Sequence, residues 1–148
     1  MLTTADRSAG PAVRSFVHWV AEPTAESVPQ VRSRVRAMLD DWRVAAEVVD
    51  ALLLTVSELV GNVVLHVGAG AGRMRVALAV GGGWLRLEVA DGGAGLPRLP
   101  APRREVDPDA ESGRGLLMVQ LLAAELGGEL SVVVGGLGKA VRVRVPVP

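Results

Sequence analysis

Apolar positions along the chain repeat with two different periods, which divide it into helices and strands. Between residues 24 and 42 apolar side chains recur at helical spacing, and residues 45–67 form a second, far more apolar helical segment. Two alternating segments, 73–80 and 84–90, then flank a run of glycines, which is a β-hairpin signal. We therefore expect two helices followed by two antiparallel strands.

The remainder of the chain continues this pattern. A weak strand pattern covers residues 14–20, a third helix is predicted over 116–126 before a glycine pair, and a second hairpin joins 130–134 to 140–145. This order of elements predicts an α+β fold in two layers. Its helices would pack on one face of a mostly antiparallel, mixed sheet.

The chain is expected to form one domain, because 148 residues leave little room for a second. Residues 1–12 are small and polar and are predicted to form a flexible tail, so the domain would cover residues 13–148. Residues 91–113 are rich in glycine, proline and charge and show no periodicity. Loops of this length are usually functional or disordered.

Composition and charge exclude several classes of function. The chain has 16 basic and 16 acidic residues, so it lacks the basic excess of a dedicated nucleic-acid or membrane-surface binder. It has no cysteine, which excludes disulfides, thiolate catalysis and Cys-ligated zinc. The first residues do not resemble a signal sequence, and the most apolar segment carries Glu58, Asn62 and His66. We therefore expect a cytoplasmic protein that does not enter a membrane.

Polar side chains within the apolar second helix form a candidate site. Glu58, Asn62 and His66 are four residues apart and lie on one stripe. A buried carboxylate or amide is costly unless it has a partner, and a hydrated Mg²⁺ ion would satisfy both groups. Asn62 could supply an oxygen ligand, and Glu58 could hold a water or accept a proton. Alternatively the stripe faces solvent, and His66 fits a half-exposed helix end as well as a ligand position.

Two glycine-containing motifs offer further contacts for a nucleotide. Asp91 ends a strand and is followed by Gly93 and Gly95, so its carboxylate can accept from an exocyclic amine while a base approaches the backbone. The run Gly113–Gly115 precedes an apolar helix, whose free N–H groups would attract a phosphate. An ordinary Asp-Gly turn and a flexible joint remain the alternatives.

In this order the three motifs resemble those of the GHKL superfamily of Bergerat-fold ATPases and kinases. Residues 58–66 resemble its N box, residues 91–95 its first glycine box and residues 113–116 its second. The runs Ser57–His66 and Glu111–Leu116 are most similar to those of the stand-alone anti-sigma-factor serine/threonine-protein kinases. The resemblance covers nearly the whole chain.

This resemblance implies a role for each motif residue. Glu58 would be the general base, Asn62 would coordinate an Mg²⁺ ion that bridges the nucleotide phosphates, and Asp91 would bind the adenine amino group. Gly93 and Gly95 would shape the loop beneath the base. The ATP lid would comprise residues 96–112, and the residues that close it over the phosphates would be Gly113, Arg114, Gly115 and Leu116.

The resemblance implies an enzyme that binds ATP and Mg²⁺ and phosphorylates a small antagonist protein on serine or threonine. A sigma factor is a further expected partner, and a homodimer is left open. The second hypothesis is an ATP-responsive protein-binding module with little turnover, because Gly138-Lys139-Ala140 lacks a threonine that many relatives place near the adenine. The third is a plain interaction domain that binds no nucleotide.

Features that mark other members of the superfamily are missing from the sequence. We find no phospho-accepting histidine motif, dimerising helical hairpin or transducer domain, so we expect neither a complete sensor histidine kinase nor a topoisomerase, mismatch-repair or chaperone machine. The role of Lys139 stays open, because its side chain could face solvent or the nucleotide.

Overall fold

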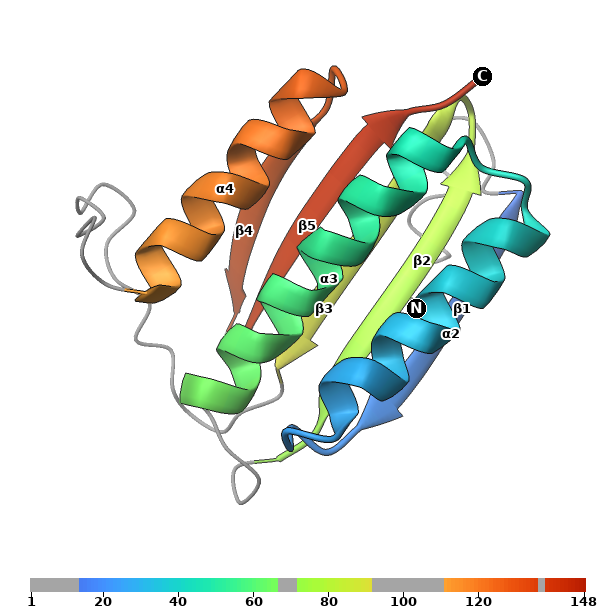
Figure 1. The fold of residues 1–148 in the computed structure, drawn as a ribbon. Coiled ribbons are helices and arrows are strands. Elements are labelled where there is room, and N and C mark those ends of the chain that lie inside the picture. Colours follow the sequence, from blue (N-terminus) through green and yellow to red (C-terminus); the bar gives the residue numbers. More distant parts are fainter. Residues whose placement is uncertain (1–13, 67–71, 92–110, 136–137) are drawn as a thin grey trace.

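The computed structural model describes residues 14–66, 72–91, 111–135 and 138–148, which form three helices and one sheet. The helices lie side by side on one face of that sheet (Figure 1). The elements in chain order are β1 (Ser15–Ala21), α2 (Ser27–Asp41), α3 (Ala46–His66), β2 (Met74–Gly81), β3 (Trp84–Asp91), α4 (Glu111–Glu125), β4 (Glu129–Gly135) and β5 (Gly138–Pro146).

The sheet has five strands in the order β1-β2-β3-β5-β4, and all four pairings are antiparallel. The last strand, β5, is therefore inserted between β3 and β4. The predicted α+β class with helices on one face of the sheet is confirmed. This arrangement brings the ends of β3 and β5, which are distant in sequence, next to each other.

The hairpin between β2 and β3 closes through a two-residue glycine turn. Gly81 pairs with Trp84, and the intervening Gly82 and Gly83 have φ angles of +62° and +85°. A two-residue turn with both central φ angles positive is the type that matches the twist of paired strands. The glycines thus fix the register of β2 and β3, which carries Asp91 to its place opposite Met74.

The hydrophobic core lies between the sheet and the helices, with α3 across its middle (Figure 1). By length and composition alone α3 could cross a membrane, but 56% of its apolar window is buried inside the domain. A helix that is apolar nearly all round is typical of a domain core. The largest fully buried side chains include Leu39 from α2, Leu52 and Leu53 from α3, and Leu78, Leu85 and Leu87 from the sheet.

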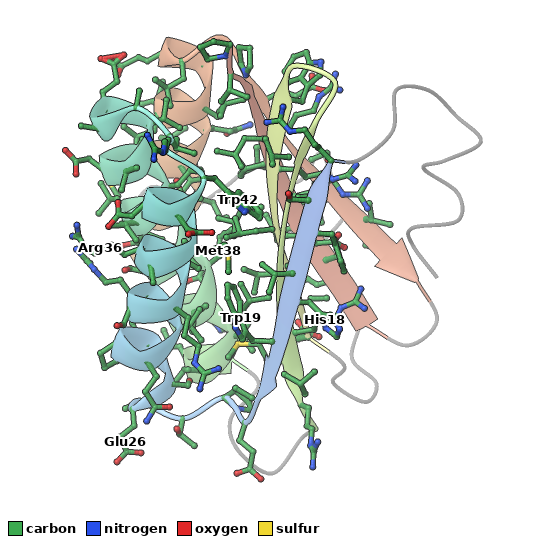
Figure 2. The ribbon with its side chains drawn as sticks, turned by 90° about the vertical axis from the view of Figure 1, so that its right-hand side faces the viewer. His18, Trp19, Glu26, Arg36, Met38 and Trp42 are labelled. Carbon is green, nitrogen blue, oxygen red and sulfur yellow. The ribbon has the colours of Figure 1, made fainter. Side chains whose placement is uncertain are left out.

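Strand β1 shows how alternation divides the two faces of the sheet. In Figure 2, Trp19 points toward α2, where Met38 and Trp42 lie, and His18 lies on the opposite face of the strand. Trp19, Met38 and Trp42 pack against the core, whereas His18 is exposed. The weak strand pattern over residues 14–20 is thus confirmed.

Helix α4 begins earlier than the sequence predicted. Its first residue is Glu111, so the predicted start at residue 116 was wrong, and Gly113–Gly115 lie within the first turns of the helix. Glycine costs about 1 kcal/mol relative to alanine in a helix, which is why the pattern favoured a later start. The predicted stop is confirmed: the Gly128 N–H donates to the Ala123 carbonyl at 2.8 Å, as in a Schellman motif.

Candidate functional site

The second half of α3 carries the polar stripe that the sequence singled out. Glu58 and Asn62 are both half-buried on this continuous helix, one turn apart, while His66 at its last position is exposed. The polar stripe is therefore half-buried at Glu58 and exposed at His66. His66 is thus exposed at the end of the helix, and its role stays open.

The start of α4 lies directly against Glu58. A Cβ atom built on Gly115 would overlap Oε1 of Glu58 and would lie 3.2 Å from its Cδ. Gly115 is itself buried, and Leu116, the next residue, packs against the core. The absence of a side chain at residue 115 therefore lets the first turns of α4 approach the carboxylate. This contact joins the first and third motifs of the sequence in space.

Asp91 ends β3 on the helix-facing side of the sheet. Leu87 and Val89 on the same strand lie in the core, and residues two apart on a strand share a face, so Asp91 also faces the helices. Asp91 is only 7% exposed. It pairs with Met74 on β2 and with Lys139 on β5. Asp91 also makes a polar or electrostatic interaction within the domain.

Gly138 allows β5 to begin beside Asp91. It has a φ angle of +147°, and a Cβ atom there would overlap the carbonyl oxygen of Asp91 and would lie 3.2 Å from Oδ1. The only sign of this close contact in the sequence is a glycine near the second predicted hairpin turn. The contact arises because β5, the last strand, pairs with β3, and the hydrophobic pattern of the sequence does not predict this pairing.

These residues gather at one end of the molecule. Figure 1 shows the last turns of α3, the first turns of α4 and the end of β3 close to one another at this end. The segments that carry Glu58 and Asn62, Gly115, and Asp91 therefore lie at the same end of the molecule, and β5 begins beside Asp91 there. An acid and an amide at one side and a second acid at the other suit a ligand with a cationic or metal-bound end and a donor-bearing end.

Several predicted residues lie outside what the structure describes. Gly93, Gly95 and residues 96–110 of the predicted lid belong to the undescribed segment 92–110. Gly113 and Arg114 belong to helix α4, but the position of the Arg114 side chain is not described. Their assigned roles stay predictions.

Mg²⁺ fits the chemistry of the residues that are present. In the described segments no group of three or more His, Cys, Asp or Glu side chains could hold a metal ion. An ion near Asn62 and Glu58 would therefore take most of its ligands from phosphates and water, which is the usual way for proteins to bind Mg²⁺. The half-buried Asn62 amide and Glu58 carboxylate are oxygen groups suited to that role.

The ion pairs recorded in the sheet lie away from this region, on its other face. Arg142 pairs with Glu88 at 3.6 Å and Arg144 with Glu129 at 3.0 Å, and these positions alternate with the core residues of their strands. The guanidinium of Arg144 also lies over the ring of Trp84, 4.1 Å from its centroid. These contacts thus lie on the face of the sheet opposite to the one that Asp91 and Lys139 share.

The fold is similar to that of several solved structures. One contains the RsbU and RsbW domains of Rv1364c from Mycobacterium tuberculosis, with a TM-score of 0.65 and 21% identity over 91% of this chain and 33% of that chain. Another is the histidine kinase domain from the Erythrobacter litoralis EL346 blue-light activated histidine kinase, with a TM-score of 0.51 and 30% identity over 68% of this chain and 45% of that chain. The chain thus spans less than half the length of either.

A third similar structure, the Acinetobacter baumannii histidine kinase AdeS, has a TM-score of 0.52 and 12% identity over 99% of this chain and 73% of that chain. No curated protein sequence matches the chain. Residues 21–145 match the model of the histidine kinase-like ATPase domain, which covers every described element beyond β1. The chain therefore belongs to the histidine kinase-like ATPase, or GHKL, family.

Proposed function

We propose that this protein is an ATP- and Mg²⁺-dependent serine/threonine-protein kinase of the anti-sigma-factor type, acting in the cytoplasm on a small antagonist protein. One observation carries the proposal: the Glu58 carboxylate lies against Gly115 at the start of α4, one helical turn from Asn62. In this proposal Glu58 is the proton acceptor and Asn62 the metal ligand, and both act beside the N-terminal turns of α4. These are the groups that phosphoryl transfer requires.

Helix α4 supplies the phosphate-binding side of this arrangement. The first N–H groups of a helix have no partner within it, and the helix dipole favours negative charge there. Residue 113 has no side chain, so phosphate oxygens could approach the first N–H groups of α4 beside it. Asn62 lies one turn after Glu58 on α3 and would hold Mg²⁺.

When bound, Mg²⁺ neutralises charge on the phosphate oxygens and so favours cleavage of the terminal phosphoanhydride. Glu58 accepts the proton of the attacking serine or threonine hydroxyl. A bond forms between that hydroxyl oxygen and the γ-phosphorus, the bond from the γ-phosphorus to the bridging oxygen breaks, and ADP leaves. Asp91, at the other side of the site, accepts a hydrogen bond from the adenine amino group and fixes the nucleotide.

The protein substrate is proposed from likeness, since the described residues do not identify it. The runs Ser57–His66 and Glu111–Leu116 resemble those of anti-sigma-factor kinases, and one similar structure includes an RsbW domain. We therefore propose a small anti-sigma antagonist as the phosphate acceptor and a sigma factor as a second partner. The exposed face of α2, which bears Arg32, Arg34 and Arg36, is available to such partners.

The test combines nucleotide binding with phosphotransfer. Mg²⁺ and ATP at about a hundred times the dissociation constant should stabilise the fold by about 2.7 kcal/mol, which a thermal-unfolding titration measures. Labelled ATP should then transfer phosphate to antagonist candidates encoded beside the gene. Glu58→Gln should abolish transfer and preserve ATP binding, whereas Asn62→Ala should weaken the binding of Mg²⁺ and ATP together.

Each part of the proposal fails on a separate result. If millimolar ATP with Mg²⁺ leaves thermal unfolding unchanged, the nucleotide-binding function is wrong. If ATP binds tightly but no candidate becomes phosphorylated, the kinase function is wrong. The second candidate function, an ATP-responsive binding module, is then favoured, and it is motivated by the stretch Gly138-Lys139-Ala140, which lacks a threonine that many relatives place near the adenine. In that case Glu58→Gln would leave partner binding unchanged.

A further inference from the structure

Lys139 lies on the helix-facing side of the sheet, at the same end as Asp91. The register of β5 pairs it with Asp91 on β3 and with Val134 on β4. Val141, two residues along β5, belongs to the core, and residues two apart on a strand share a face. Directly opposed side chains on one face have Cβ atoms about 5 Å apart. Of the two orientations that the sequence left open, the structure therefore shows that Lys139 faces inward.

The other sheet neighbours of Asp91 on this face are apolar. Met74 pairs with it from β2 and is 1% exposed, and Val89 precedes it on β3 and is 2% exposed. Lys139 is half-buried and is the one charged residue among these adjoining positions. On the other side of Lys139, its partner Val134 on the edge strand β4 is 51% exposed and offers an apolar surface. A ligand that reaches Asp91 thus meets an ammonium group and an apolar side chain beside it.

The chemistry of Lys139 and Asp91 together matches one edge of adenine. The exocyclic amino group of adenine donates, and the ring nitrogens on its two sides, N1 and N7, accept. A carboxylate accepts only, whereas an ammonium group carries three donors on a flexible stem. A carboxylate and an ammonium group side by side can therefore bind the amino group and an adjacent ring nitrogen at once.

We infer that Lys139 is a specificity-determining residue of the base site, which donates a hydrogen bond to a ring nitrogen flanking the amino group held by Asp91. The inference rests on the proposed binding of ATP. Guanine carries a carbonyl oxygen in place of that amino group, so two hydrogen-bond acceptors, this oxygen and the carboxylate of Asp91, would face each other without a proton between them.

The experiment pairs substitutions of Lys139 with nucleotides that lack single atoms. Calorimetry measures the affinities of the full chain for MgATP, Mg-1-deaza-ATP, Mg-7-deaza-ATP and MgGTP, using wild type, Lys139→Met and Lys139→Arg. Methionine keeps an unbranched stem without the charge, and arginine keeps donors. We expect Lys139→Met to weaken MgATP binding about ten- to hundredfold, as for loss of a charge-assisted hydrogen bond, and Lys139→Arg to recover most of it.

The deaza nucleotides distinguish this role from all others. One of them should bind wild type more weakly than ATP by about the same factor, and Lys139→Met should lose nothing further with that nucleotide. If Lys139→Met weakens ATP and both deaza nucleotides equally, Lys139 contacts the phosphates or only supports the fold, and the inference is wrong. It is also wrong if Lys139→Met binds ATP as wild type does, or if wild type prefers GTP.

Failure of the proposed function gives a different result. Wild type would then bind none of the four nucleotides, whereas failure of this inference leaves wild type binding MgATP. Asp91→Asn provides the matched control, because it should weaken ATP binding in both the wild-type and the Lys139→Met background.

Discussion

The Glu58 carboxylate occupies the space that a side chain at residue 115 would need. In Gly115→Ala the new Cβ would overlap Oε1 of Glu58, so the Glu58 side chain must move. We expect this variant to lose phosphotransfer and to gain no stability. In the Glu58→Ala background the obstacle is gone, and Gly115→Ala should then stabilise the fold by up to about 1 kcal/mol through helix propensity. Urea unfolding of the four variants of this cycle measures the coupling.

Gly61, on α3, is a suitable comparison, because a Cβ atom there has no described atom within 4 Å. Gly61→Ala should stabilise the fold in both backgrounds by a similar amount. Equal effects of Gly115→Ala with and without Glu58 would show that the two residues do not touch.

Gly138 is constrained by the main chain, which cannot move aside as a side chain can. A Cβ atom there would overlap the carbonyl oxygen of Asp91, so Gly138→Ala must separate β5 from β3. We expect a loss of about 1–3 kcal/mol, typical of overpacking, and a marked loss of ATP affinity. Gly83→Ala is the control: its φ angle is also positive, but the nearest atom would lie at 3.9 Å. It should lose some stability and keep ATP affinity, as measured by urea unfolding and calorimetry.

At this scale the sequence could name the acids and the amide of the site, because residue type and spacing carry that information. Glu58, Asn62 and Asp91 were predicted in this way, and the structure brings Glu58 together with Gly115. Lys139 faces inward because it lies two residues from Val141 on β5, and Val141 belongs to the core. This orientation could not be decided earlier because the strand was predicted to begin at residue 140.

At the scale of the elements, the end of α2 holds a backbone conformation that its residue does not favour. Arg43 has a φ angle of +59°, and the next N–H, of Val44, donates to the Leu39 carbonyl at 3.1 Å. This is the arrangement that glycine usually provides after a helix. Since Arg43 is exposed, Arg43→Gly should stabilise the fold by about 0.5–1 kcal/mol.

Urea unfolding measures this gain, and Arg43→Ala serves as its control. Alanine removes the same side chain but keeps the unfavourable conformation, so it should change stability by less than about 0.5 kcal/mol. If alanine stabilises as much as glycine, the effect comes from the lost charge and the conformational account is wrong.

Most elements could be predicted because their apolar periods are clear, and the exceptions are instructive. The start of α4 was placed too late because Gly113 and Gly115 weaken helix propensity. Packing of this segment against α3 outweighs that local preference. Interactions between distant segments of this kind cannot be derived from a window of neighbouring residues.

At the scale of the whole molecule, the insertion of β5 between β3 and β4 creates the site, and no local pattern predicts it. Hairpins can be inferred from adjacent alternating segments, and both were. The pairing of β3 with β5 joins segments separated by a loop, a helix and a strand. It places Lys139 beside Asp91, so the composition of the candidate site depends on topology.

The same core that supports the sheet also positions the site, yet core packing and ligand binding should be separable. Leu87 is fully buried on β3, so Leu87→Ala should cost about 2–5 kcal/mol, whereas Leu121→Ala, on the exposed side of α4, should change stability by less than about 0.5 kcal/mol. A domain with the usual stability of about 5–15 kcal/mol would still fold. Since ATP binds the folded form, saturating MgATP should add the same free energy to both variants as to wild type. Thermal unfolding with and without MgATP tests this, and a smaller gain for Leu87→Ala would show that a cavity beneath β3 disturbs Asp91 at its end.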